Sequence, residues 1–159
     1  MAQSFDPIAV LLQEHNEALD QLKRLNLAVG ELSQHGYSKK VGKQLTSSLR
    51  YIEHEVKDHN RKEEDALFPI LETYVEGPTK LMRSDHKKLR KGFEQLRKAI
   101  DKLQQNPDSF SAIKTLSTIA KDIVQLFVNH IHKENYILFP LVQKLLTKDE
   151  LREVAKKML

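Results

Sequence analysis

Two copies of one short pattern, 71 residues apart, contain the residues of this chain that could do chemistry. The repeated residues are His59, Glu63 and Leu67-Phe68-Pro69 in the first copy, and His130, Glu134 and Leu138-Phe139-Pro140 in the second. One further histidine precedes each copy by 44 residues, His15 in the first case and His86 in the second. Four imidazoles and two carboxylates in the same register predict a two-metal site with an internal two-fold relation.

The spacing explains how these side chains could meet. A histidine and a glutamate four residues apart on a helix lie on the same face and can bind one metal centre. His59 and Glu63 fall at positions where apolar residues otherwise recur, so this face is the core stripe of the helix. Burying such groups without partners would cost several kcal/mol each, and metal coordination would satisfy them together. The predicted metal ligands are His15, His59, Glu63, His86, His130 and Glu134.

The ligand types restrict the metal. Imidazole and carboxylate suit iron, manganese, zinc and copper, and the chain has no cysteine that would favour softer ions. Two bridging carboxylates favour a pair of ions about 3.5–4 Å apart. We expect two iron ions per chain, with zinc or manganese as possible substitutes.

A plainer interpretation must be weighed for each residue alone. A single histidine on an apolar helix face is usually a hydrogen-bonded core residue, and an isolated His-x-x-x-Glu is often a surface pair. The coincidence of all six residues favours the metal site. The other histidines, His35 in a loop and His54 and His132 off the stripe, are expected at the surface. Glu64 could support a ligand from outside, and its counterpart in the second copy is Asn135.

Helix signals surround these residues. Asp6 and Pro7 predict the start of a first helix, and breaks are expected at residues 35–37, 77–78 and 105–108. Core positions repeat with the same offset in both halves, approximately residues 6–76 and 77–146. They include Ala66 and Ile70 in the first half, and Phe93, Ile137 and Leu141 in the second. The sequence therefore predicts an all-α fold: a single domain over residues 1–159, built as an up-down-up-down four-helix bundle from two duplicated helix hairpins.

Two features concern the helix ends. Pro69 and Pro140 fall at equivalent points, where a kink or an end of the helix is expected. Thr147 and Glu150 form a capping-box pattern before a short C-terminal helix, residues 148–158. Its apolar side could cover the end of the bundle or serve an oligomer contact.

Composition limits the possible settings. Apolar residues at 40% and charged residues at 30% are typical of a globular chain. No apolar run suits a signal peptide or a membrane span, so we expect a cytoplasmic protein that does not bind membranes. The basic residues between Lys80 and Lys98 avoid the apolar stripe of their helix. They are therefore expected to form a solvated face and not a nucleic-acid site.

The arrangement closely resembles the haemerythrin-like, or HHE cation-binding, domains, from Asp6 to about Lys144. The residues that carry the resemblance are Leu11-Leu12-Gln13-Glu14-His15, His59 to Pro69, Ser84-Asp85-His86 and His130 to Pro140. The resemblance implies that His15 and His59 hold one iron and that His86 and His130 hold the other. It also implies that Glu63 and Glu134 bridge the two irons beside an oxo or hydroxo group.

Two departures from the oxygen-carrying members bear on activity. Those proteins have a further histidine one turn before the position of His86, where this chain has Met82. They also place an aspartate five residues after the last histidine, where this chain has Glu134 at four. The resemblance then implies exchangeable positions on both metals. The symmetric ligand set is more similar to the di-iron domain of iron–sulfur-cluster repair and nitric-oxide-stress proteins.

Three functions are compatible with these residues. The first is a di-iron protein that binds O2 or NO for sensing, storage or stress response. The second is a redox enzyme that turns over peroxide or NO, or a protein that handles iron as repair proteins do, with Tyr51 and Tyr136 as possible redox partners. The third is a helical interaction module with a structural metal. The sequence does not decide whether the chain is an enzyme, and its redox or protein partner is not indicated.

Overall fold

The computed structural model describes residues 5–159, and within that range every regular element is a helix. The elements follow the chain in the order α1 (Pro7–His35), α2 (Lys39–Tyr51), η1 (Ile52–Val56), α3 (Lys57–Arg61), η2 (Lys62–Leu67), α4 (Phe68–Leu71), α5 (Gly77–Gln105), α6 (Phe110–Lys133), η3 (Glu134–Leu138), α7 (Phe139–Leu145) and α8 (Lys148–Met158). The segments labelled η are π-helical turns. Each continues the α-helix on either side, so α2 to α4 form one rod and α6 to α7 form another.

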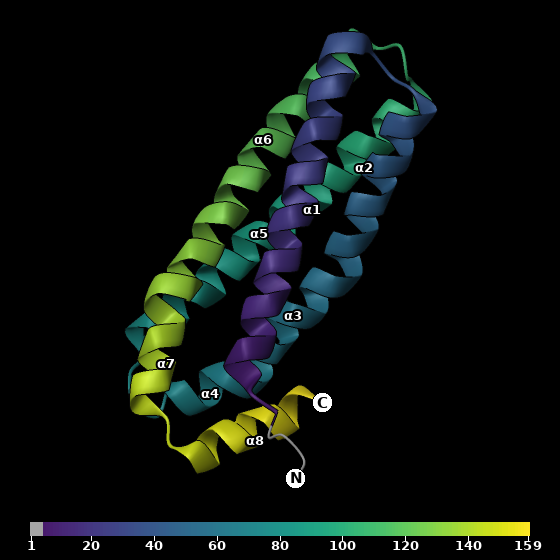
Figure 1. Cartoon of the computed structure of the whole chain (residues 1–159). Helices are drawn as coiled ribbons and strands as arrows, with labels where there is room; N and C mark the ends of the chain where they lie inside the picture. The colour runs from purple at the N-terminus through teal and green to yellow at the C-terminus, as the bar shows by residue number, and fades with distance from the viewer. Residues whose placement is uncertain (1–4) are drawn as a thin grey trace.

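These rods build the predicted up-down-up-down bundle, which confirms the all-α fold class (Figure 1). Helix α1 contacts α2 and α6, and α5 contacts α6 and α2, so the four rods close into a ring. Local signals set the ends. The side chain of Asp6 accepts hydrogen bonds from the backbone N–H groups of Ile8 and Ala9, and Gly36 ends α1 with φ at 84°.

The core is divided into two apolar clusters with a polar layer between them. One cluster fills the end of the bundle near the loops that join α1 to α2 and α5 to α6, and includes Leu25, Leu96 and Leu116. The other fills the opposite end and includes Leu11 and Met82. The six predicted ligands lie where one cluster gives way to the other along each rod, and all six are buried. The bundle therefore encloses its most polar residues near one end, away from solvent.

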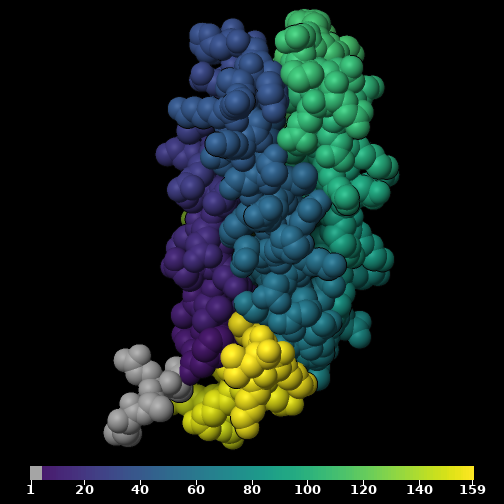
Figure 2. Space-filling model, turned by 90° about the vertical axis from the view of Figure 1, so that its right-hand side faces the viewer, coloured from purple at the N-terminus to yellow at the C-terminus, as the bar shows by residue number. Residues whose placement is uncertain are grey.

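Helix α8 lies across the foot of the bundle, as Figures 1 and 2 show. It contacts α1 and η2, and buries Val154, Ala155 and Met158. The capping box predicted for Thr147 and Glu150 is present, with both reciprocal hydrogen bonds. Of the two roles considered for this helix, the structure shows the first, a cover for the end of the bundle.

The structure corrects part of the expected core at the end of the fourth rod. The residue that faces inward after Glu134 is four positions on and not three. Leu138 is buried, whereas Ile137 is 62% exposed, and its expected core position was wrong. The counterpart Ala66 is buried in the first half, in η2, the segment that contacts α8.

Three smaller expectations also change. The helix end expected near each proline is found in the first half only, because α4 ends at Leu71 while α7 continues past Pro140 to Leu145. His35 is the last residue of α1 and not a loop residue, although it is exposed as expected. Phe93, expected in the core, is only half-buried.

Candidate metal centre

The bundle brings the six predicted residues together as two overlapping groups. One group is His15, His59, Glu63 and Glu134, and the other is Glu63, His86, His130 and Glu134. In each group the candidate ligand atoms lie within 4.8 Å of one another. Both glutamates belong to both groups, and each pair of histidines belongs to one. This is the arrangement that two neighbouring ions sharing two carboxylates would require.

Each glutamate lies between histidines of different pairs. Glu63 Oε1 is 3.4 Å from His59 Nε2 and 3.3 Å from His86 Nε2. Glu134 Oε1 is 3.0 Å from His15 Nε2 and 3.2 Å from His130 Nε2. The i to i+4 spacing on the helix therefore supplies one contact of each glutamate, and the packing of another rod supplies the second.

The outer nitrogens of all four imidazoles have acceptors that determine their tautomers. His59 Nδ1 donates to Glu14 at 3.0 Å, and His130 Nδ1 donates to Asp85 at 3.1 Å. The two acceptors occupy equivalent positions, each one residue before the histidine of the neighbouring rod. With the proton on Nδ1, the lone pair of each Nε2 points toward the middle of the cluster.

The remaining two histidines repeat this arrangement with one difference. His86 Nδ1 donates to Glu64 Oε1 at 2.8 Å, and His15 Nδ1 donates to Asn135 Oδ1 at 2.6 Å. Glu64 and Asn135 each follow a bridging glutamate, as their equivalence in the repeat requires. One histidine pair therefore has two anionic acceptors, and the other has one anionic and one neutral acceptor.

The centre of the cluster contains acceptors without donors. Among the residues that the structure describes, both carboxylate oxygens of Glu63 and of Glu134 and the Nε2 atoms of His86 and His130 are buried and have no hydrogen-bond partner. The Nε2 atoms of His15 and His59 face each other at 3.1 Å, a spacing that suits two nitrogens each about 2.0–2.1 Å from one ion. Buried acceptors facing one point require either protons or cations, so the residues fit a metal pair.

Electrostatics agree with this interpretation. Although burial opposes the charged form, the carboxylates of Glu63 and Glu14 raise the pKa of His59 to about 10. Burial likewise opposes a charge on His130, but Glu134 and Asp85 raise its pKa to about 9. The glutamates thus favour positive charge in this layer, which a proton or a metal ion can provide.

Lysines hold the outer acidic residues in place. Lys62 Nζ donates to Glu14 at 2.7 Å, and Lys133 Nζ donates to Asp85 at 2.6 Å. Burial raises the pKa of each acid, but the contacts with lysine and histidine outweigh it and leave both pKa values below their usual range. Glu14 and Asp85 are therefore charged acceptors.

Sequence reasoning did not identify these outer acids and lysines as part of the site. A signal was present, because the pairs Glu14–Lys62 and Asp85–Lys133 are related by the 71-residue offset. Glu64 was recognised as a possible supporting residue, and the structure gives it that position beside His86. Its counterpart Asn135 plays the equivalent part for His15.

The other candidates lie away from the cluster or beside it. His54 and His132 are exposed, as expected. Tyr136 is 76% exposed. Tyr51, in contrast, lines a small cavity together with His15 and His59. Burial and nearby glutamates raise the pKa of Tyr51 to about 12, so its hydroxyl keeps its proton.

A helical bundle with paired histidines and shared glutamates in its core defines a class of protein that binds metal through imidazole and carboxylate. Comparison with known families agrees. The Hemerythrin HHE cation binding domain matches residues 6–157, nearly the whole chain. The chain belongs to this family, which confirms the resemblance seen in the sequence.

The chain is also similar to individual proteins of known name, although this similarity does not establish its activity. The chain is 25% identical over 136 residues to the iron-sulfur cluster repair protein YtfE of Escherichia coli (strain K12 / DH10B) and to the protein of the same name from Shigella boydii serotype 18. The alignment covers 82% of this chain and 62% of each relative. The chain therefore spans less than two thirds of the length of the relatives it matches.

No described helix is both long and apolar enough to cross a membrane.

Proposed function

We propose that this chain binds two iron ions in the buried cluster. One ion is held by His15 and His59, the other by His86 and His130, and both glutamates bridge them. The observation that supports this proposal is the sharing of Glu63 and Glu134 by two groups of otherwise separate histidines. A structural site for one ion would not need two such groups.

We further propose that the physiological ligand is small and diatomic, O2 or NO, bound for sensing, storage or stress response. Burial supports this choice: His86 and both glutamates are fully buried, and His15 and His130 are 2% exposed. An organic substrate could not contact such a centre without opening the bundle. Bound iron would supply electron exchange with the diatomic ligand, which protein side chains cannot.

The protein residues prepare the site for this chemistry. Glu14, Asp85, Glu64 and Asn135 orient the imidazoles through their Nδ1 atoms. Two phenylalanines lie against the histidines on the side of the covered bundle end. Phe139 stacks on His15 with ring centroids 5.2 Å apart, and Phe68 stacks on His86 at 5.8 Å. Such apolar contacts exclude water from the cluster.

Metal analysis tests whether the chain binds two iron ions. Protein produced in iron-supplemented medium is expected to contain two irons per chain, with a near-ultraviolet band from an oxo bridge. His59→Ala and Glu134→Ala should lose iron and the band. His54→Ala and His132→Ala remove exposed histidines from the same rods and should lose neither. One zinc per chain, or no metal in properly folded protein, would contradict the proposal.

Ligand titration tests whether the iron-loaded protein binds O2 or NO. The reduced protein is titrated with NO and separately with O2 under anaerobic control, while the visible spectrum is recorded. A saturable spectral change that reverses when the gas is removed supports binding. Steady consumption of NO or peroxide above the rate of free iron would instead favour a redox enzyme.

The relatives support a second candidate, iron handling in iron–sulfur-cluster repair. This candidate depends on the similarity to proteins named for that activity and on the iron-binding set itself. Iron-loaded protein mixed with an iron-depleted [4Fe–4S] protein, sulfide and a reductant would restore the cluster faster than an equal amount of free Fe(II). Equal rates would remove this candidate.

A further inference from the structure

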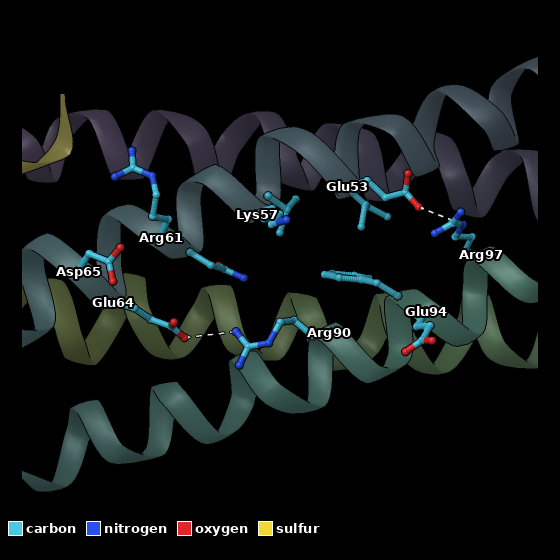
Figure 3. A pocket seen from close by; sticks show the side chains of 12 residues that line it. Glu53, Lys57, Arg61, Glu64, Asp65, Arg90, Glu94 and Arg97 are labelled. Atoms are coloured by element: carbon cyan, nitrogen blue, oxygen red, sulfur yellow. Dashed lines mark hydrogen bonds and ion pairs between the residues drawn. The ribbon is translucent and has the colours of Figure 1, made fainter.

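A cleft of about 550 Å³ lies between η1, α3 and η2 on one side and the facing helix α5 on the other (Figure 3). Its apolar wall includes Ile52, Val56 and Phe93. Polar residues line the rest, among them Lys57, Asn60 and Arg90. The volume falls in the range of about 300–1,000 Å³ that is typical of small-molecule sites.

The two halves of the internal repeat differ at this cleft. The matching seam, between α1 and α6, has apolar residues at the equivalent positions. Lys57 corresponds to Val128, Asn60 to Ile131 and Arg90 to Leu19. Ile131 is fully buried, and Val128 and Leu19 pack against the same apolar cluster. One seam between the hairpins is therefore closed by apolar packing, and the opposite seam is open and polar.

Asn60 is a polar side chain without a partner in this cleft. It is 92% buried, since only 8% of its surface is exposed. Its amide makes no side-chain hydrogen bond within residues 5–159, and its polar atoms are not among the enclosed atoms that lack a partner, so solvent in the cleft reaches them. A ligand in the cleft could replace this solvent and form hydrogen bonds with both ends of the amide.

Four acidic and four basic side chains line the cleft, so its formal charge is balanced. Arg61 pairs with Asp58 at 3.0 Å. Glu53 pairs with Arg97 at 3.6 Å, and Glu94 pairs with Lys98 at 3.6 Å. Glu64 accepts from His86 at 2.8 Å.

Lys57 has no carboxylate partner in the described part of the chain, and Arg90 has only a 3.5 Å contact with Glu64, drawn as a dashed line in Figure 3. The remaining acid, Asp65, is exposed and lies toward one end of the cleft. The two cations come from opposite walls, one from α3 and one from α5.

We propose that this cleft binds a small organic acid. The carboxylate lies between Lys57 and Arg90, the apolar body lies against Phe93 and Val56, and a polar atom pairs with the amide of Asn60. This inference goes beyond the proposed di-iron function and does not depend on it. The site adjoins the metal cluster because Glu64, which contacts Arg90, also holds His86.

Calorimetric titration of the full chain, as isolated, tests the proposal with two probes, 1-naphthoate and octanoate. At least one is expected to bind with one molecule per chain. Lys57→Val and Arg90→Leu copy the closed seam, and each should weaken binding about five- to tenfold. Asn60→Ile copies Ile131 and fills the cleft, so it should abolish binding while the helical circular dichroism is kept.

Two controls make the result specific. Lys43→Val removes the same charge from another surface hollow on α2 and should leave binding unchanged. Neutral 1-naphthalenemethanol, which has the same ring system as 1-naphthoate, should bind at least tenfold more weakly. Absence of saturable binding by both acids, equal binding of the neutral probe, or wild-type affinity in the Lys57 and Arg90 variants would overturn the proposal.

Discussion

His15 donates a hydrogen bond from Nδ1 to the side-chain oxygen of Asn135 at 2.6 Å. The two-fold counterpart of this contact joins His86 to the carboxylate of Glu64 at 2.8 Å. A carboxylate acceptor makes an imidazole a stronger donor of electrons to its metal than an amide does. The two candidate metal positions therefore have equivalent sets of ligand side chains and differ in the residues that accept hydrogen bonds from their imidazoles.

This difference predicts opposite effects for two substitutions. Asn135→Asp should lower the reduction potential of the iron-loaded centre by tens of millivolts, on the scale of 59 mV per tenfold change in a one-electron equilibrium. Glu64→Gln should raise the potential, because it removes negative charge behind His86. Spectroelectrochemical titration measures both. Asn129→Asp adds the same charge at an exposed position of α6 and should shift the potential much less.

Asp85 should matter for metal retention. Asp85→Ala removes the acceptor of His130 and the partner of Lys133. Loss of such a supporting contact typically costs about 10–100-fold in metal affinity, and we expect this range here. Competition with a coloured chelator measures the affinity. Asp122→Ala, an exposed acid on the same bundle, is the control, and a comparable loss there would show that the contact has no special role.

The pH dependence of stability should differ between the metal-free and the metal-loaded protein. In the metal-free fold, the raised pKa values of His59 and His130, about 10 and about 9, mean that protonation stabilises the folded state. This contribution is complete below the ordinary histidine pKa of 6.5 and is lost as the pH rises through 9 to 10.

Metal binding has the opposite sign because the imidazoles must lose their Nε2 protons to coordinate an ion. Metal affinity should therefore increase with pH over the same interval. Urea unfolding of the metal-free protein and chelator competition with the loaded protein, both over this pH range, measure the two trends. Parallel trends would contradict the assignment of these histidines as ligands.

Phe139 should stabilise the fold and the cluster together. It is 1% exposed and stacks on His15, so Phe139→Ala is expected to lower the free energy of unfolding by about 3–5 kcal/mol. Phe110→Ala removes a ring that is 78% exposed and should have little effect. Urea denaturation of both variants gives the comparison. Iron content of the folded Phe139→Ala protein shows whether the ring also protects the site.

Some expectations failed for a reason that sequence periodicity cannot show. Ile137 was expected in the core because the apolar stripe was extended with an α-helical period. Both equivalent segments, η2 and η3, contain a π turn, yet Ala66 in η2 is buried and Ile137 in η3 is 62% exposed. Helix α8 packs against η2, and this is a tertiary contact that the period of a single helix does not show.

The fold class and the six candidate site residues were predictable from the sequence alone. Both follow from the helical period, a local property that places His59 with Glu63 and His130 with Glu134 on one face. Packing between rods determined which residue accepts a hydrogen bond from each imidazole. Glu14, for example, contacts His59 from another rod. Packing also decided that one seam closes around Ile131 while the other opens at Asn60. These are contacts between rods, which depend on how whole helices pack and which no spacing along one helix can specify.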